Sequence, residues 1–252
     1  MSTANQEEFI NTIKMALGKA MAASQRDADL FKSDMSDETR TILERLKNRT
    51  PEGRKKLLAT FIEAAGPINL EVISCEDVNS VTAAIVDLVR DKDPEWGHKK
   101  SVVAWRHPLI ENLNLPAALS QQDVNVFFAD LKELEGENLR RHVIDSYIGI
   151  TAADFCIADS ATLVMRTRAG QARSVSLVPA IHIAVIELNQ IIADLKELYA
   201  LLKWDPKVKK EGLTNCMTFI CGPSKTADIE ATMVHGAHGP REVYVFVITA
   251  EY

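Results

Sequence analysis

"VSLVPAIHIAVI" (residues 175–186) and "EVYVFVIT" (242–249) are apolar along almost their whole length. Neither has the strict alternation of apolar and polar residues that is typical of a strand with one face in water. Strands of this kind are buried on both faces, as in parallel sheets that helices cover on either side. We interpret 242–249 as the last strand of the chain, and 175–186 as a buried strand pair or one bent strand.

Other apolar segments extend this pattern along the chain. SVVAW (101–105), VNVFF (124–128) and CMTFIC (216–221) also predict buried strands, and DFCIADSATLVMR (154–166) predicts two strands around a turn. Between the strands, apolar residues recur at helical spacing, as from Ile191 to Leu202. This alternation predicts the α/β class, with a mostly parallel sheet flanked by helices.

The beginning of the chain has a different character. EEFINTIKMALGKAM (7–21) carries an apolar face at helical spacing, whereas residues 22–40 are polar and charged and indicate a connector. Thr50 followed by Pro51 is typical of an N-cap and a first helical residue. We therefore expect an N-terminal helix and charged linker over 1–48 and a single α/β domain over 49–252.

Composition excludes several classes of protein. The 252 residues carry a formal net charge of −6, which argues against nucleic-acid binding because phosphate contacts need an excess of Lys and Arg. The start, MSTANQEEF, lacks the pattern of a secretory signal, and no apolar run is long enough to cross a bilayer. We expect a cytoplasmic chain without nucleic-acid or membrane partners, and a homo-oligomer is compatible with these numbers.

The four cysteines lie in apolar, strand-like contexts without a CxxC or Cys/His cluster. This spacing does not favour structural zinc or a self-contained iron–sulfur site. The sequence therefore predicts buried free thiols in a reducing compartment, with no metal site and no cofactor in this chain. These cysteines are Cys75, Cys156, Cys216 and Cys221.

The segment CGPSKT (221–226) follows an apolar strand and contains residues suited to a ligand-binding turn. Gly222 can adopt the angles of a tight turn, and Ser224 or Thr226 can cap a helix that begins near Ala227. Free backbone N–H groups there, together with Lys225, would attract a carboxylate or phosphate. A capped strand–helix turn without a ligand explains the same residues, and the GxxxxGK spacing of a P-loop is absent.

A second segment, GITAADFCIADSATLV (149–164), places polar residues in an otherwise apolar stretch. Thr151, Asp154, Asp159 and Ser160 would each cost about 1–3 kcal/mol if buried without a partner. We therefore expect them to be hydrogen-bonded or to face a cleft. The competing interpretation is a β-turn at Asp159-Ser160, with Asp154 as a turn or cap residue.

Two histidines are candidates for proton transfer. His182 lies inside an apolar run, where an imidazole is usually buried, and acid–base work would need a carboxylate within reach. His238 is flanked by Gly236 and Gly239 and lies close to Arg241, which can bind an anion. A structural turn and a ligand loop explain the His238 segment equally well.

Four segments, taken in order, resemble the LUD-domain family in its lactate-utilization branch. The segment 7–20 is similar to that family's short N-terminal helix, and 149–164 contains Gly-x-Thr-x-Ala-Asp followed by Ile-Ala-acid. SLVPAIHIAV (176–185) resembles its Ser-Leu-x-Pro…His-Ile segment, and GPSKTADIE (222–230) followed by HGPRE (238–242) resembles its C-terminal signature. The matches cover most of 101–252 and the N-terminal helix.

The resemblance implies a fold like that of ribose-phosphate isomerases and CoA-transferases, with an N-terminal helical part. It also implies a role in oxidising L-lactate to pyruvate together with partner subunits, some of which carry iron–sulfur clusters. Ser160-Ala161 departs from the Thr-Gly expected at this place, and the Ala161 methyl would hinder close approach of a ligand. The motif positions that carry over are Thr151, Asp154, Asp159, Ser176, Pro179, His182, Gly222, Ser224, Thr226, Asp228, Glu230, His238, Gly239 and Pro240.

These observations lead to three hypotheses. The chain has neither a GxGxxG motif after a strand nor cluster-type cysteines, so the preferred one is a non-redox subunit of an L-lactate-oxidising complex that binds a small carboxylate or other anion. In this role His182, Asp159 and His238 are the candidate catalytic residues. The second is a stand-alone enzyme acting on a phosphorylated or CoA-linked substrate, with Asp159 or Glu230 as nucleophile. The third is a ligand-sensing module without chemistry.

All three hypotheses rely on one spatial prediction. The Gly222–Thr226 bend, the Asp159 hairpin and the His238 turn should share a cleft that binds negative charge.

Overall fold

The computed structural model describes residues 11–13, 15, 34–94, 99–130, 136–211, 214, 216–227 and 233–250. The chain divides into two compact units, Met1–Glu44 and Arg45–Tyr252. The helix expected over 7–21 lies outside the described residues except for 11–13 and 15, which are helical. The prediction of a connector over 22–40 is wrong at its C-terminal end, because helix α3 (Asp37–Lys47) begins inside that range.

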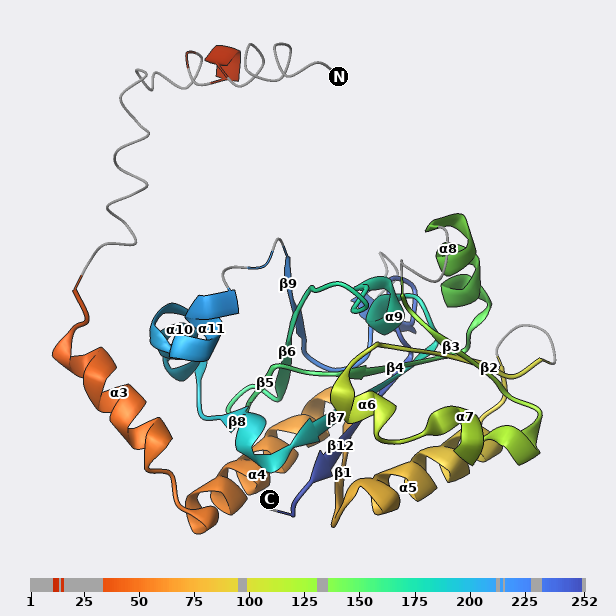
Figure 1. Ribbon diagram of the computed structural model, residues 1–252, viewed down its shortest axis with the longest axis horizontal. Helices are drawn as coiled ribbons and strands as arrows, with labels where there is room; N and C mark the ends of the chain where they lie inside the picture. Colours follow the sequence, from red (N-terminus) through yellow and green to blue (C-terminus); the bar gives the residue numbers. More distant parts are fainter. Residues whose placement is uncertain are drawn as a thin grey trace. The chain divides into compact units, whose positions relative to one another are not determined.

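The second unit is built on a six-stranded sheet in which all neighbouring strands run parallel (Figure 1). Helices connect these strands, as the alternating apolar segments predict, so the α/β class and the mostly parallel sheet are confirmed. In sheet order the strands are β1 (Leu70–Cys75), β12 (Glu242–Ile248), β7 (Ile181–Glu187), β4 (Ile148–Ala152), β2 (Ser101–Ala104) and β3 (Asn125–Phe128).

Helices cover both faces of this sheet. Val81 and Ile85 of α5 are fully buried in the apolar cluster on one face. Phe61 of α4 and Val175 of α9 are fully buried in the cluster on the other face. The helices of the first face are α5 (Val78–Asp91), α6 (Pro108–Glu111) and α7 (Leu115–Ala118); those of the second are α4 (Pro51–Ala65), α8 (Gly136–Asp145) and α9 (Ser174–Leu177).

A second sheet of four strands is reached directly from β4. Its order is β8 (Ile191–Ile192), β5 (Phe155–Ile157), β6 (Thr162–Arg166) and β9 (Met217–Ile220). The antiparallel β5–β6 pair confirms the two strands that were expected around Asp159-Ser160. Helices α10 (Leu195–Trp204) and α11 (Pro206–Glu211) follow β8, and 3-10 turns span Gly66–Ile68 (η2), Ser120–Gln122 (η3) and Leu188–Gln190 (η4).

The segment 175–186 is neither a strand pair nor a bent strand. Its first part forms α9, and only its second part enters β7. Helix α9 lies so close to β4 that a Cβ at Gly149 would stand 1.8 Å from the carbonyl oxygen of Val175. The missing side chain of Gly149 therefore permits a helical turn where local sequence favours a strand.

The helix expected near Ala227 is also wrong. β10 (Lys225–Ala227) instead pairs antiparallel with β11 (Met233–His235), with Thr226 opposite Val234. Because a hairpin satisfies backbone groups across two strands, its formation depends on a partner segment that a local capping pattern does not reveal. The Ser224–Thr226 segment consequently has no helix N-terminus to offer an anion.

The cysteines follow the sequence prediction in part. Cys75 and Cys156 are buried and unpaired, and burial raises the pKa of both thiols. Cys216 is partly buried, whereas Cys221 is exposed, so the prediction of a buried thiol is wrong there. In the part of the chain that the structure describes, none of the helices has the length and apolar character needed to cross a membrane.

A buried ion pair joins α10 to the start of the second unit. The Glu197 side chain is fully buried and accepts hydrogen bonds from Arg45 at 2.9 Å and Arg49 at 2.6 Å. Its other oxygen accepts from the backbone N–H of Ala193 at 2.7 Å. Removing one partner of such a pair is strongly destabilising because it leaves a buried charge without compensation.

Glu197→Gln should therefore lower the free energy of unfolding by about 3–5 kcal/mol, measured by urea denaturation. Asp87→Asn is the matched control, because the Asp87–Arg90 pair has both side chains more than half exposed. That control should change the free energy by about 0–1 kcal/mol. Equal small effects of the two variants would contradict the structural role of Glu197.

Candidate active site

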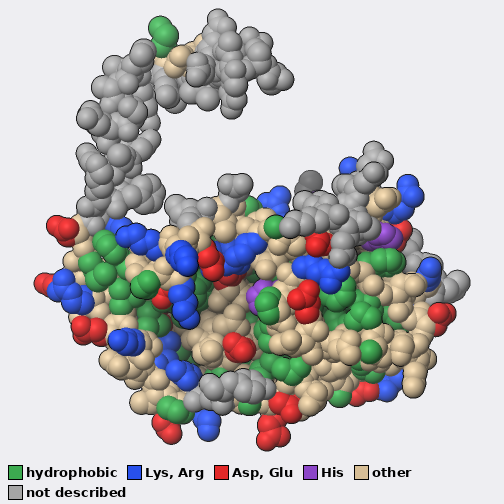
Figure 2. All heavy atoms as spheres, viewed as in Figure 1, with side chains coloured by type: hydrophobic (Ala, Val, Ile, Leu, Met, Phe, Trp, Pro, Cys, Tyr) green, Lys and Arg blue, Asp and Glu red, His purple; other side chains and the backbone are tan. Residues whose placement is uncertain are grey.

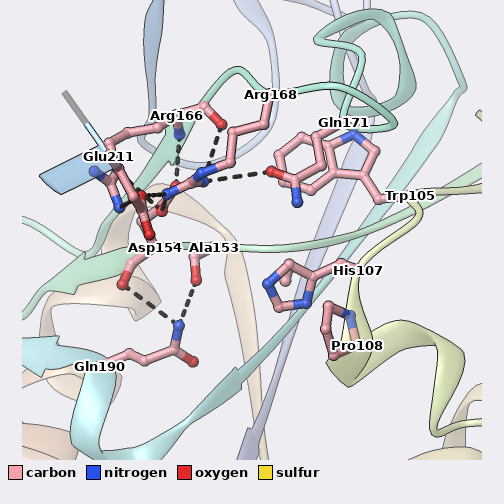
Figure 3. A pocket seen from close by; sticks show the side chains of 11 residues that line it. Trp105, His107, Pro108, Ala153, Asp154, Arg166, Arg168, Gln171, Gln190 and Glu211 are labelled. Atoms are coloured by element: carbon pink, nitrogen blue, oxygen red, sulfur yellow. Dashed lines mark hydrogen bonds and ion pairs between the residues drawn. The ribbon is translucent and has the colours of Figure 1, made fainter. Parts of the chain in front are cut away.

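A cavity of about 350 Å³ lies at the carboxyl ends of β2 and β4 (Figure 3). Ligands in open α/β sheets collect at this edge because loops leave the strands there. Ala104 ends β2 and is followed by Trp105 and His107, while Ala152 ends β4 and is followed by Asp154. The lining residues are Trp105, His107, Pro108, Ala152, Ala153, Asp154, Arg166, Arg168, Gln171, Gln190 and Glu211.

Asp154 is the most strongly bonded group of this cavity. Its side chain is only 10% exposed, and its Oδ1 accepts from Arg166 Nε at 3.0 Å and from Arg168 Nη2 at 2.7 Å. Its Oδ2 accepts from the backbone N–H of Arg166 at 2.6 Å. The β5–β6 hairpin produces this arrangement, because Phe155 pairs with Val164 and the preceding Asp154 therefore lies next to Arg166 at the end of β6.

Glu211, the last residue of α11, adds a second carboxylate to the same arginines. Its Oε2 lies 2.8 Å from Arg168 Nη2 and 3.0 Å from Arg166 Nη2. The hydrogen bond from Arg168 lowers the pKa of Glu211. Burial lowers the pKa of Arg168, but its hydrogen bonds to Asp154 and Glu211 outweigh that effect and raise it. Glu211 and Arg168 are therefore both charged at neutral pH.

The opposite wall is largely apolar, and Figure 3 shows His107 and Pro108 across the cavity from the arginines. Trp105 is fixed there by a hydrogen bond of 2.9 Å from its Nε1 to the carbonyl oxygen of Ala172. His107 Nδ1 accepts from the backbone N–H of Leu109 at 3.2 Å. Burial lowers the pKa of His107, so the imidazole is neutral at pH 7 and carries its hydrogen on Nε2.

Gln190 holds the backbone at the point where the chain leaves β4. Its Nε2 donates to the carbonyl oxygen of Ala153 at 2.5 Å, and its Oε1 accepts from the backbone N–H of Glu187 at 2.7 Å. Because Glu187 ends β7, the carboxyl ends of β4 and β7 are tied together. The position of Asp154 is thus set by side-chain contacts as well as by the hairpin.

Two of the three loops that were expected to share a cleft, the Gly222–Thr226 bend and the His238 turn, are in contact, but they line no part of the Asp154 cavity. Ser224 N–H donates to Pro240 O at 2.8 Å, and Ser224 O accepts from Gly236 N–H at 3.0 Å. The backbone N–H of His238 reaches Ser224 Oγ at 3.3 Å. Gly236, Gly239 and Arg241 line a second cavity of about 600 Å³ that also contains Ser101, Tyr147 and Ala180, at the amino ends of the parallel strands.

Asp159 and Ser160 lie on the exposed β5–β6 turn and line neither of these two cavities. Their link to the other loops is a contact of 3.2 Å between Cys221 Sγ and the carbonyl oxygen of Ser160. The prediction that all three loops share one cleft is therefore wrong for the Asp159 hairpin. Asp228 and Glu230 lie outside the described residues.

His182 lies in the interior of the sheet on β7. Its side chain has no exposed surface, and its Nε2 hydrogen-bonds Thr151 Oγ1 at 2.8 Å. Burial lowers the pKa of His182 to about 3, so the imidazole is neutral at physiological pH. This placement favours the interpretation of a buried core imidazole, and neither His182 nor Thr151 lines the Asp154 cavity.

Among the predicted site residues that the structure describes, Asp154 alone lines the cavity at the carboxyl ends. The arginines, His107, Gln190 and Glu211 were missed. Two signals were present in the sequence: Arg166 ends an otherwise apolar strand, and His107 lies two residues after the apolar segment 101–105. The pairing of Arg168 with Glu211 has no local signal, because 43 residues separate them.

Charge is mixed on the face of the molecule that Figure 2 shows. On the coloured part of the face in Figure 2, basic and acidic side chains are interspersed rather than gathered into a patch of one sign. Among the described residues, no group of three or more His, Cys, Asp or Glu side chains is placed to hold a metal ion. The site is thus defined by the buried Asp154–arginine cluster rather than by a broad surface field.

Fold and cavity together define an α/β protein with a polar cavity at the carboxyl edge of a parallel sheet. The chain belongs to the LUD domain family, whose model matches residues 58–248. The matched region includes every residue that lines the Asp154 cavity.

Curated relatives match over nearly the full length. Lactate utilization protein C of Halalkalibacterium halodurans is 28% identical, with 96% of this chain and 97% of the relative covered. Lactate utilization protein C of an Exiguobacterium species is 30% identical, with 96% of each chain covered. The crystal structure of a DUF162 family protein from Deinococcus radiodurans has a TM-score of 0.51 at 19% identity, covering 77% of this chain and 98% of that one, and supports the fold.

The Glu211 carboxylate should titrate below the 4.5 of an unperturbed glutamate, because ionisation is favoured beside Arg168. Its ion pairs should persist above that pH and be lost as pH falls through the lowered pKa. Carbon-13 NMR of the Glu211 carboxyl group measures this directly. Arg168→Gln should move the pKa back toward 4.5, whereas Arg90→Gln on α5 should not; a native value at or above 4.5 would refute the pairing.

Proposed function

We propose that the protein is a non-redox subunit of an L-lactate-oxidising complex and binds a small carboxylate in the Asp154 cavity. The observation that carries this proposal is the pair of arginines at the carboxyl edge of the sheet. Arg166 and Arg168 both line the cavity, and Nη1 of Arg166 is buried without a hydrogen-bond partner among the described residues. A guanidinium fork is well suited to a carboxylate, and an unpaired buried donor gains free energy when a ligand oxygen reaches it.

The two walls of the cavity fit a short acid. The charged wall suits the carboxylate, and Trp105, Pro108 and Ala153 offer apolar contact to a methyl group. The neutral His107 keeps one N–H that can donate to a hydroxyl or keto oxygen of the same ligand. The cavity volume of about 350 Å³ lies at the small end of ligand sites, as a three-carbon acid requires.

Family membership supports the cellular role. Relatives named lactate utilization protein C align over 96% of this chain, so lactate utilization is the role we assign to it. Oxidation of lactate needs an acceptor for two electrons, and the cysteine spacing in this sequence is not that of an iron–sulfur ligand set. We therefore assign electron transfer to partner subunits with iron–sulfur clusters and ligand binding to this chain, in the cytoplasm.

The alternative of an enzyme with a nucleophilic carboxylate receives less support. Of the two nucleophiles expected for it, Asp159 is exposed on a hairpin turn and does not line the cavity, and Glu230 lies outside the described residues. Asp154 does line the cavity, but it is held by two arginines, which lowers its nucleophilicity. A ligand-sensing module would use the same cavity, and assembly with a redox partner distinguishes it from the proposed subunit.

Arg168→Gln should weaken binding of L-lactate or pyruvate to the full-length protein about ten- to hundredfold, because it removes a charge-assisted hydrogen bond worth about 1.5–3 kcal/mol. NMR chemical-shift titration with each acid gives the dissociation constants. Arg90→Gln removes an equal charge from the exposed surface of α5 and should leave binding unchanged. Saturable binding that is equally strong in wild type and Arg168→Gln would place the ligand elsewhere.

Assembly is tested in cells grown on L-lactate. The tagged protein should co-purify with a brown partner whose absorption spectrum shows iron–sulfur clusters, and deletion of this chain should abolish growth on L-lactate. Complementation with Arg168→Gln should fail where Arg90→Gln succeeds. Normal growth of the deletion strain on L-lactate would overturn the proposed role.

A further inference from the structure

We infer that the Glu211 carboxylate occupies the arginine pair as an internal stand-in for the ligand's carboxylate, and that a ligand binds by displacing it. This inference rests on the proposed carboxylate site and adds to it the group with which the ligand must compete. It makes Glu211 a residue that sets affinity rather than a fixed part of the binding wall.

The two carboxylates that contact the arginines are held in unequal ways. Asp154 is 10% exposed, uses both oxygens and accepts a backbone N–H as well as two guanidinium N–H groups. Glu211 is 49% exposed, and it makes its ion pairs with Arg166 and Arg168 through the same oxygen, Oε2. Exposed ion pairs contribute little to stability, whereas buried charges with several hydrogen bonds are costly to separate. Glu211 is therefore the exchangeable partner.

The place of Glu211 in its helix gives the same result. It is the last residue of α11, which has six residues. A negative charge at a helix C-terminus is unfavourable because the helix dipole is negative there. Its position is thus explained by the arginines it contacts and not by any benefit to α11.

Displacement would improve the pairing of Arg166. Glu211 Oε2 contacts Nη2 of Arg166 at 3.0 Å, while Nη1 is buried and has no partner among the described residues. A ligand carboxylate in place of Glu211 can accept from both Nη1 and Nη2 in the bidentate geometry that guanidinium groups favour. Asp154 on Nε keeps the guanidinium in position during the exchange.

The cavity tolerates this exchange without rearrangement of the core. Glu211 lies beside a cavity that already extends to Trp105 and His107, so the incoming acid enters next to the side chain it replaces. Figure 3 shows Glu211 and the two arginines together on one side of this space. The half-exposed side chain of Glu211 can then turn toward solvent.

Glu211→Gln in the full-length protein tests the inference with L-lactate and pyruvate as probes. Removing the competing charge should tighten binding about two- to fivefold, which corresponds to the strength of an exposed ion pair. Glu63→Gln, an exposed acid on α4, removes the same charge away from the cavity and should have no effect. Glu211→Ala, which lacks the amide oxygen, should tighten binding at least as much.

A second readout is independent of affinity. In wild type, saturation with the ligand should raise the Glu211 pKa toward 4.5, because the ligand takes over the arginines. The inference would be overturned if the wild type binds the acid, both Glu211 variants bind it equally well or more weakly, and the Glu211 pKa stays constant on saturation. That result would leave the proposed function standing. If Glu63→Gln tightens binding as much as Glu211→Gln does, the gain in affinity is a general effect of net charge, and the inference is overturned. Absence of binding in wild type and in both Glu211 variants would overturn the carboxylate site itself.

Discussion

The arrangement of the whole site depends on the hydrogen bonds of one carboxylate. The chain leaves the parallel sheet at Ala152 and enters the second sheet at Phe155, and Asp154 lies between the two. Its oxygens accept from the backbone and side chain of Arg166 and from Arg168. This carboxylate both closes the β5–β6 hairpin and orients two guanidinium groups, because donors that converge on one buried anion constrain each other's positions. The connection between the two sheets and the proposed ligand site thus depend on the same side chain.

The parts of the fold that were predictable are those set by neighbouring residues. Strand β12 is apolar after Glu242, as burial on both faces of a parallel sheet requires, and α10 shows its helical period directly. Helix α9 and the β10–β11 hairpin were not predictable, because they depend on contacts between distant segments. A glycine 26 positions before Val175 permits the first, and strand pairing produces the second.

For the candidate site, too, the sequence indicated some residues and could not indicate others. Asp154 could be selected because a polar residue in an apolar stretch needs a partner, and the structure provides one. The partner itself could not be chosen from sequence, since any of 29 Lys and Arg residues satisfies the charge. The general rule about carboxyl ends of strands was correct, but it was applied to the end of β9 rather than to the ends of β2 and β4. Family motifs mark the right segments without stating which of their side chains face the cavity.

Trp105 has one further consequence. The residue is 2% exposed, its indole is anchored to the carbonyl oxygen of Ala172, and it lines the same cavity as the arginines. An indole in such a place responds to nearby charge and hydration through its emission spectrum. The molecule therefore contains an intrinsic fluorescent reporter in the cavity where we propose that the ligand binds, and occupancy of that cavity can be followed in solution without any label.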